Sequence, residues 1–239
     1  SRNAEGYAAF CRELMETMVG FLPAVRVSFS AFVLLGHDGL YHLSQTLIKA
    51  AELGYYVLLD APEILSPISA KITADSLFGE GSIYPCDGLV ISGYLGSDVI
   101  KPFLPYCSDF QKDLYLIVRT ANKSAPELQD LLTGTRLAHV AATDTVKRHG
   151  ESLMGKCGYS RVCAMASASA PTSLRTLRAK YKGVFLLVDG LDYPSGNAKN
   201  CSHAFDKFGH GAAVCAGPSV TAAWLSNETD GNDYVEQAV

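Results

Sequence analysis

Polar side chains stand directly after apolar, β-branched runs of this sequence, where parallel α/β sheets commonly carry their functional groups. Asp60 closes the run YYVLLD, and Thr120 and Asn122 follow the run LYLIVR. A carboxylate at a strand end can act in proton transfer, and a hydroxyl beside an amide can orient a small ligand. Asp60 also suits the cap of a following turn or helix, so its position alone leaves both roles open.

Two glycine-bearing loops follow later apolar runs. Gly190 and Gly196 lie in VDGLDYPSGN, and Gly217 lies in CAGPSV. Backbone N–H groups in such turns can hold an anion such as phosphate. Asp189 and Asp192 stand in the first of these loops and would repel an anion, which favours a cation instead.

Cysteine and histidine are scattered along the chain rather than clustered. The sequence has seven cysteines and six histidines, and the closest pair is Cys201 and His203. A zinc site needs several such ligands at short spacing, and a nucleotide loop needs a glycine-rich motif that is absent here. We therefore predict no metal and no cofactor, and we expect reduced thiols and a cytoplasmic location.

Seven apolar runs alternate with helical patterns. These elements must position the polar side chains and glycine loops described above. We predict strands at residues 24–33, 55–60, 88–92, 114–119, 161–166, 183–190 and 212–217. We predict helices at residues 2–19, 39–53, 66–78, 97–108, 125–131, 138–156, 171–180, 199–208 and 219–225. Strands that are apolar throughout are typical of a parallel sheet covered on both faces. The pattern predicts an α/β fold, a TIM (β/α)8-type barrel whose first strand is missing or replaced, in a single domain over residues 1–239.

Composition excludes several classes of protein. The 239 residues are 48% hydrophobic and 18% charged, which excludes a disordered chain. The formal net charge is −4, so we predict no nucleic-acid partner. No uninterrupted apolar run reaches membrane-spanning length, so we predict no membrane partner.

Several segments together resemble the orotidine 5′-phosphate decarboxylase family in its longer bacterial form. The resemblance is collinear over about residues 10–225. Its segments are VSFSAFVLLGHDGL (27–40), YYVLLDAPEILSPIS (55–69), CDGLVISGYLGSDVIKPFL (86–104), VRTANKSAPELQDL (118–131) and FLLVDGLDYPSGNAKNCSHAFDKFGHGAAVCAG (185–217).

The resemblance implies an enzyme of pyrimidine biosynthesis that converts orotidine monophosphate to UMP without a cofactor. Its centre is an alternating Lys-Asp-Lys-Asp array, whose last Asp reaches into the partner subunit of a dimer. The array stabilises a carbanion-like transition state, and one lysine donates the proton.

Most of that array is replaced in this sequence. The family's first Asp falls on Asp60 and its first Lys on Arg26. The second Lys falls on Pro62, which can donate no proton, and the second Asp falls on Leu65. The candidate catalytic residues are therefore Asp60, the one array residue that is kept, and Arg26.

The substrate contacts implied by the resemblance are also reduced. The family's Thr falls on Ser69, and its base-contacting Ser falls on Ala121. Its Gln falls on Pro194 and its phosphate-binding Arg on Pro218. The candidate substrate-binding residues are Asn122, Thr120, Ser69, Gly190, Gly196 and Gly217.

Three functions remain open from the sequence. The first is a pseudoenzyme, a catalytically inactive relative that binds a nucleotide or another small molecule. The second is a barrel enzyme or binder with a new activity at an acidic mouth that includes Asp60, Asp189 and Asp192. The third is an active decarboxylase with rearranged groups, such as Lys71 or Lys101. The resemblance implies a dimer, and the apolar loop at residues 61–68 can be buried against a partner, so we predict a homodimer.

Overall fold

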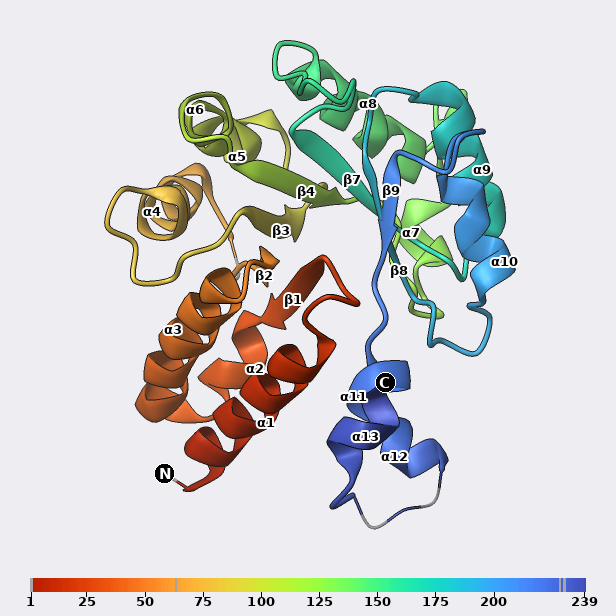
Figure 1. Cartoon of the computed structure of the whole chain (residues 1–239). Helices are drawn as coiled ribbons and strands as arrows, with labels where there is room; N and C mark the ends of the chain where they lie inside the picture. The colour runs from red at the N-terminus through yellow and green to blue at the C-terminus, as the bar shows by residue number, and fades with distance from the viewer. Residues whose placement is uncertain (1, 63, 228, 230) are drawn as a thin grey trace. The chain divides into compact units, whose positions relative to one another are not determined.

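The computed structural model describes residues 2–62, 64–227, 229 and 231–239 (Figure 1). Its main sheet has seven strands in the order β1-β2-β3-β4-β7-β8-β9, and the strand pairs with a described register are parallel. The strands are β1 (Ala24–Ser28), β2 (Tyr56–Asp60), β3 (Gly88–Ser92), β4 (Asp113–Ile117), β7 (Val162–Ser167), β8 (Leu186–Asp189) and β9 (Ala212–Val214). An order that follows the chain is that of a (β/α)8 barrel, here with seven strands in the described residues.

The chain divides into two compact units, each with its own internal contacts. The first comprises residues 1–63, 72–89 and 217–239, and the second comprises residues 64–71 and 90–216. The prediction of a single domain stays a prediction, because β3 and α4 each contribute residues to both units.

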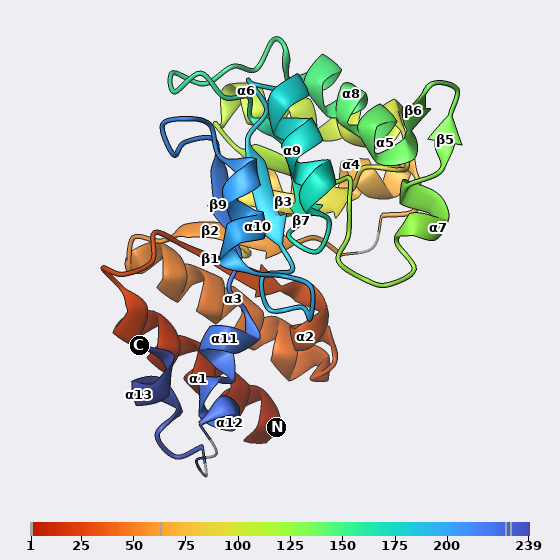
Figure 2. The same cartoon turned by 90° about the vertical axis from the view of Figure 1, so that its right-hand side faces the viewer.

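The first unit packs helices on β1 and β2. Its helices are α1 (Arg2–Met18), α2 (Phe29–Val33), α3 (Gly36–Glu52), most of α4 (Pro67–Phe78), α11 (Pro218–Thr221), α12 (Ala223–Ser226) and α13 (Tyr234–Ala238). Leu43, Leu47 and Ala50 lie fully buried on one face of α3, at the spacing of a helix that covers a sheet. At the end of the chain, α13 contacts α1, where the rings of Phe10 and Tyr234 are 4.9 Å apart (Figure 2).

The second unit continues the alternation of strands and helices. Its helices are α5 (Ser97–Ile100), η1 (Lys101–Phe103), α6 (Leu104–Asp109), α7 (Pro126–Gln129), α8 (Ala138–Gly150), α9 (Pro171–Lys180), α10 (Ala198–Cys201) and η2 (Ser202–Ala204). All six residues of β7 are buried, as expected for a strand covered on both faces. Within the described residues, no helix combines the length and hydropathy needed to cross a bilayer.

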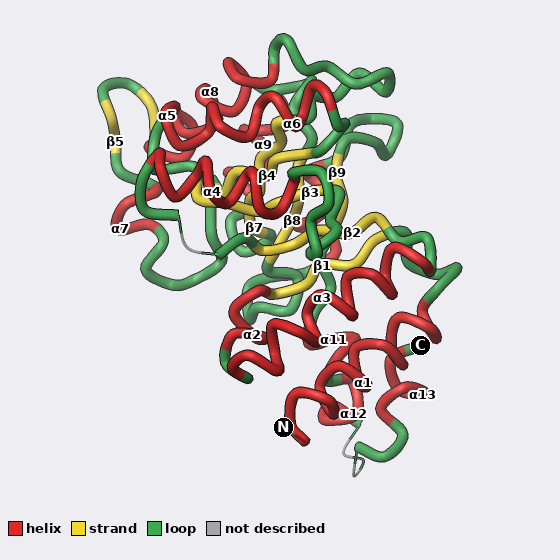
Figure 3. The backbone as a smooth tube through the Cα atoms, turned by 90° about the vertical axis from the view of Figure 1, so that its left-hand side faces the viewer, coloured by secondary structure: helices red, strands yellow, loops and turns green. Residues whose placement is uncertain are grey.

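The predicted strands are present, and the differences are local. The run at 24–33 stops as a strand at Ser28 and continues as helix α2, which buries Phe32. Helix α8 ends at Gly150 rather than at residue 156, and a Cβ at Gly150 would be 2.1 Å from Ser160 Oγ. A short hairpin of β5 (Leu132–Thr133) and β6 (Arg136–Leu137) was not predicted, and Figure 3 shows β5 beside α7.

Candidate functional site

The two candidate catalytic residues form an ion pair in the first unit. Arg26 Nε lies 2.8 Å from Asp60 Oδ1, and the two side chains are 25% and 32% exposed. Arg26 pairs in register with Leu58, two residues before Asp60 on the neighbouring strand. Because side chains alternate along a strand, Arg26 and Asp60 share a face of the sheet and meet diagonally.

The chain after Asp60 offers apolar groups. Ile64 is buried, whereas Leu65 is 73% exposed. Between Asp60 and Ser69 the sequence contains no lysine, and Pro62 stands two residues after the carboxylate. The described part of this loop therefore supplies no ammonium group beside Asp60, and the guanidinium of Arg26 contacts its carboxylate.

Thr120 and Asn122 are brought together in the second unit, directly after β4. Thr120 Oγ1 donates a hydrogen bond to Asn122 Oδ1 at 2.6 Å. The side chain of Gln129 in α7 supports this pair, since its Oε1 accepts from Thr120 N at 2.8 Å and its Nε2 donates to Thr120 Oγ1 at 2.9 Å. Gln129 was not among the predicted site residues.

A buried cluster holds the loop that carries these two residues. Arg119 is 7% exposed and donates from Nε and Nη2 to the two carboxylate oxygens of Asp130, each at 3.0 Å. His139 is buried, with Nδ1 2.9 Å from Gln129 O and 3.1 Å from Asp130 Oδ1. Such a bidentate, charge-assisted pair fixes both partners in orientation.

Tyr94 supports the same segment from the loop after β3. Its hydroxyl donates to Val118 O at 2.5 Å. Burial raises the pKa of Tyr94 to about 12, against the opposing effect of the Arg119 charge. The hydroxyl therefore keeps its proton and remains a donor at neutral pH.

The loop after β8 folds back tightly on its two glycines. Gly190 has φ +77°, and a Cβ there would be 2.5 Å from Ser167 Oγ and 3.0 Å from Ala121 Cβ. A Cβ at Gly196 would be 1.9 Å from Gly190 O. Gly190, Gly196 and the loop of Thr120 and Asn122 are thus neighbours within one unit.

Two serines at the end of β7 belong to this neighbourhood, and the sequence analysis missed them. Ser167 Oγ and Ser169 Oγ are 2.8 Å apart, and Ser169 Oγ is 3.4 Å from Ala121 O. The run ending in MASAS carried the signal, because a buried strand that ends in hydroxyl residues places them at the carboxyl edge of the sheet.

Ser69 and Gly217 make local helix contacts. Ser69 Oγ accepts from Leu65 N at 3.1 Å and from Ser66 N at 3.0 Å, which closes the first turn of α4. Gly217 is the N-cap of α11, and its carbonyl accepts from Val220 N and Thr221 N at 2.9 Å each. The described contacts do not bring either residue to the other candidates.

Asp189, one of the residues of the predicted acidic mouth, contacts its own loop in the second unit. Asp189 Oδ1 accepts from Gly190 N at 2.8 Å. Among residues 2–62, 64–227, 229 and 231–239, no group of three His, Cys, Asp or Glu side chains could hold a metal ion. The two lysines considered as replacements lie in helices, Lys71 in α4 and Lys101 in η1.

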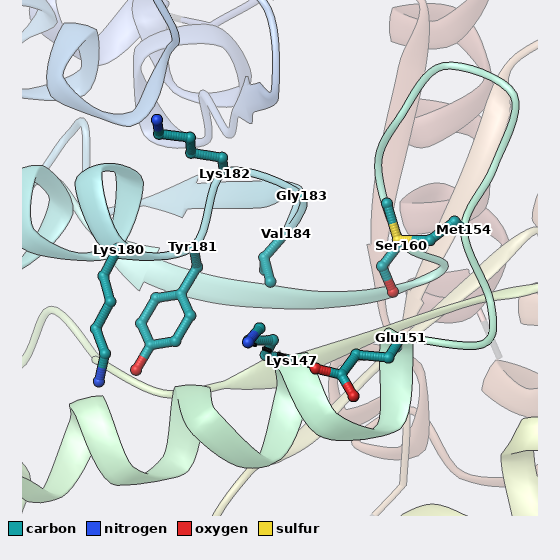
Figure 4. A pocket seen from close by; sticks show the side chains of 10 residues that line it. Lys147, Glu151, Met154, Ser160, Lys180, Tyr181, Lys182, Gly183 and Val184 are labelled. Atoms are coloured by element: carbon teal, nitrogen blue, oxygen red, sulfur yellow. Dashed lines mark ion pairs between the residues drawn. The ribbon is translucent and has the colours of Figure 1, made fainter.

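A pocket opens at the opposite ends of the strands. Its lining includes Lys147, Tyr181 and Val184, and it lies before the starts of β7 and β8 (Figure 4). Lys147 Nζ is 3.4 Å from Glu151 Oε1, so one of its lysines is already paired. Because function in this fold class lies at the carboxyl ends of strands, this pocket is separate from the candidate site.

The fold and the candidate residues define a class of protein, the TIM-type parallel α/β proteins whose functional groups follow their strands. No protein-family model matches the chain. Two curated proteins named orotidine 5′-phosphate decarboxylase are similar to it. The one from Rhodopirellula baltica is 29% identical over 215 residues, covering 88% of this chain and 71% of its own length. The one from Clostridium kluyveri is 29% identical over 231 residues, covering 96% and 78%.

A solved structure supports the same fold. The OMP decarboxylase of Leishmania donovani superposes with a TM-score of 0.76 at 22% identity, covering 98% of this chain and 84% of that one. The similarity to these curated proteins confirms the resemblance to the orotidine 5′-phosphate decarboxylase family seen in the sequence.

Proposed function

We propose that this chain is an orotidine 5′-phosphate decarboxylase relative that binds a pyrimidine nucleotide but does not decarboxylate orotidine monophosphate. One observation carries the proposal, the ion pair between Arg26 and Asp60 at 2.8 Å. In the mechanism that the resemblance implies, a lysine beside this aspartate donates a proton to the carbanion. A guanidinium remains protonated in proteins, so Arg26 does not replace that donor.

The sequence of the following loop supports the same conclusion. Pro62 stands where the resemblance places the central lysine, and its side chain has no proton to give. Leu65 stands where the second aspartate is expected, so its side chain adds no negative charge to destabilise a substrate carboxylate. Because the proton-donating lysine and the alternating charges of the array are both absent, electrostatic preorganisation and general acid catalysis are both lost.

The direct test is an assay of the purified chain with carboxyl-labelled orotidine monophosphate. We expect release of labelled carbon dioxide to stay at the rate of the buffer. The variant Asp60→Asn serves as the control, because it removes the carboxylate while keeping its size. Release above the buffer rate that disappears in Asp60→Asn would refute the proposal.

Nucleotide binding is tested separately by thermal unfolding. We expect millimolar UMP, orotidine monophosphate or 6-azauridine monophosphate to raise the Tm, because a ligand that binds only the folded state stabilises it. The candidate ligand groups follow β4 and β8, namely Thr120, Asn122, Gly190 and Gly196. No change of Tm with any of the three nucleotides would contradict this part of the proposal.

We also propose that the protein is a homodimer. Leu65 and Ile68 are 73% and 75% exposed, so this segment presents two large apolar side chains that a second copy would cover. The predicted interface loop spans residues 61–68, of which residue 63 lies outside the described residues.

A further inference from the structure

The hydroxyl of Thr120 stands between two amide side chains. On one side it accepts from Gln129 Nε2 at 2.9 Å, and on the other it donates to Asn122 Oδ1 at 2.6 Å. The three side chains form a short relay that starts on α7 and ends at the exposed Asn122.

Hydrogen-bond valence sets the direction of this relay. The backbone N–H of Thr120 is only a donor, so the group that it contacts at 2.8 Å must be the oxygen of Gln129. The nitrogen of Gln129 therefore faces Thr120 Oγ1 as a donor. The single proton of that hydroxyl then has two acceptors in reach, Asn122 Oδ1 at 2.6 Å and Gln129 Oε1 at 3.2 Å.

The distances favour donation to Asn122. A separation of 2.6 Å is typical of O–H···O contacts and short for N–H···O contacts. The atom of Asn122 that faces Thr120 is accordingly its oxygen, and the nitrogen, with its two donors, faces away from the relay.

Gln129 can impose this direction because its own position is fixed. The next residue, Asp130, is held by Arg119 through two hydrogen bonds of 3.0 Å each. The carbonyl of Gln129 lies 2.9 Å from His139 Nδ1. Arg119 and His139 are both buried.

We propose that Gln129 is a positioning residue that, through Thr120, presents the amide N–H₂ of Asn122 to the ligand. This proposal rests on the nucleotide site of the proposed function. The ligand must offer a hydrogen-bond acceptor to Asn122.

The orientation can be tested without a ligand by nuclear magnetic resonance of the ¹⁵N-labelled chain. The side-chain amide signal of Asn122 is identified by its loss in Asn122→Asp. We expect this amide to be rigid in the unmodified protein and mobile in Thr120→Val and in Gln129→Glu. In the second variant the carboxylate accepts the hydroxyl proton, so Asn122 Oδ1 loses its donor.

Glu127→Gln is the matched control for these variants. It exchanges a carboxylate and an amide on the same helix, and Glu127 is exposed. We expect it to leave the Asn122 amide rigid. An Asn122 amide that is equally rigid in Thr120→Val and Gln129→Glu would overturn the positioning role.

Contact with the ligand is tested by titrating UMP into the same proteins. We expect Thr120→Val to bind UMP roughly tenfold more weakly than the unmodified chain, because the amide of Asn122 is no longer held toward the ligand. Glu127→Gln should bind UMP as the unmodified chain does. Equal affinities in Thr120→Val and the unmodified chain would overturn the contact between Asn122 and the ligand. Failure of the unmodified chain to bind UMP would overturn the proposed nucleotide site, while the amide dynamics alone would still decide the role of Gln129.

Discussion

Gly190 shows how one residue type permits the close packing of the candidate site. Its φ of +77° lies in the left-handed region, and Ser167 occupies the space where a Cβ would project. Glycine adopts this conformation freely, whereas other residues are strained there. The residue therefore allows the loop after β8 to approach the ends of its neighbouring strands.

Replacing Gly190 with alanine tests this packing. We expect Gly190→Ala to lower the free energy of unfolding by about 2–4 kcal/mol, since backbone strain and a steric clash add together. Gly134→Ala is the control, because Gly134 has φ +69° with nothing within 4 Å of the added Cβ. The control should cost only about 1 kcal/mol. Equal losses in chemical denaturation would show that the contact with Ser167 does not matter.

The single residue His149 makes the stability of the folded protein depend on pH. Burial lowers its pKa below the usual value, and the nearby charges of Arg148 and Lys101 lower it further. Its Nε2 lies 3.0 Å from Ser97 Oγ. The unfolded chain therefore binds a proton on this ring more readily than the folded protein does.

The sign of the effect follows from this difference. As the pH falls below about 6.5, protonation favours the unfolded state, so the folded protein loses stability. We expect His149→Gln to lose less stability than the unmodified chain between about pH 6.5 and pH 5, as measured by urea unfolding. An unchanged pH dependence in His149→Gln would contradict the assignment.

At the scale of elements, Arg178 ties α9 to the beginnings of two strands. The side chain is buried, and its Nε donates to Ala204 O at 2.6 Å. Its Nη2 donates to Gly211 O at 2.6 Å and its Nη1 to Val184 O at 3.1 Å. These carbonyls lie just before β8 and β9 or in the connection between them, so one side chain fixes the entry of the chain into both strands.

Removal of this guanidinium should destabilise the fold strongly. We expect Arg178→Met to lower the free energy of unfolding by about 3 kcal/mol or more, because several buried carbonyls lose their donor. Arg175→Met, on the exposed face of the same helix, should cost less than about 1 kcal/mol. A loss in Arg178→Met as small as that of Arg175→Met would show that water replaces these bonds.

At the scale of the whole molecule, the proposed dimer explains why the 61–68 loop exposes apolar side chains. We expect light scattering at micromolar concentration to give twice the monomer mass. Leu65→Glu combined with Ile68→Glu should shift the protein toward monomer, because charge at an apolar interface is costly to bury. Leu225→Glu is the control, since Leu225 is 60% exposed outside this loop. A monomeric unmodified chain would refute the proposed dimer.

The sequence predicted the elements well because their signals are local. Seven apolar runs became seven strands, since burial on both faces of a sheet leaves a continuous apolar pattern. Helix α9 also begins and ends as predicted. The exceptions had weaker signals. Residues 24–33 are one apolar run in the sequence, but the structure divides them between strand β1 and helix α2. The hairpin around Gly134 has only two residues in each strand.

The sequence predicted which residues are candidates from their type and their position after apolar runs. It did not predict which side chains contact one another. Asp60, Thr120 and Asn122 were identified because they follow apolar runs. Gln129 was missed, because a glutamine on a short helix carries no signal of its role in the sequence.

By itself, the sequence determined the parallel α/β class and the family resemblance, and it has Pro62 where that resemblance implies a proton-donating lysine. Only the tertiary structure decided that Arg26 pairs with Asp60, 34 residues away, and that Gln129 supports Thr120. The physical reason is that secondary structure follows from hydrophobic periodicity along the chain. A hydrogen bond depends instead on the distance and direction of two atoms, which are set only when separate elements pack together.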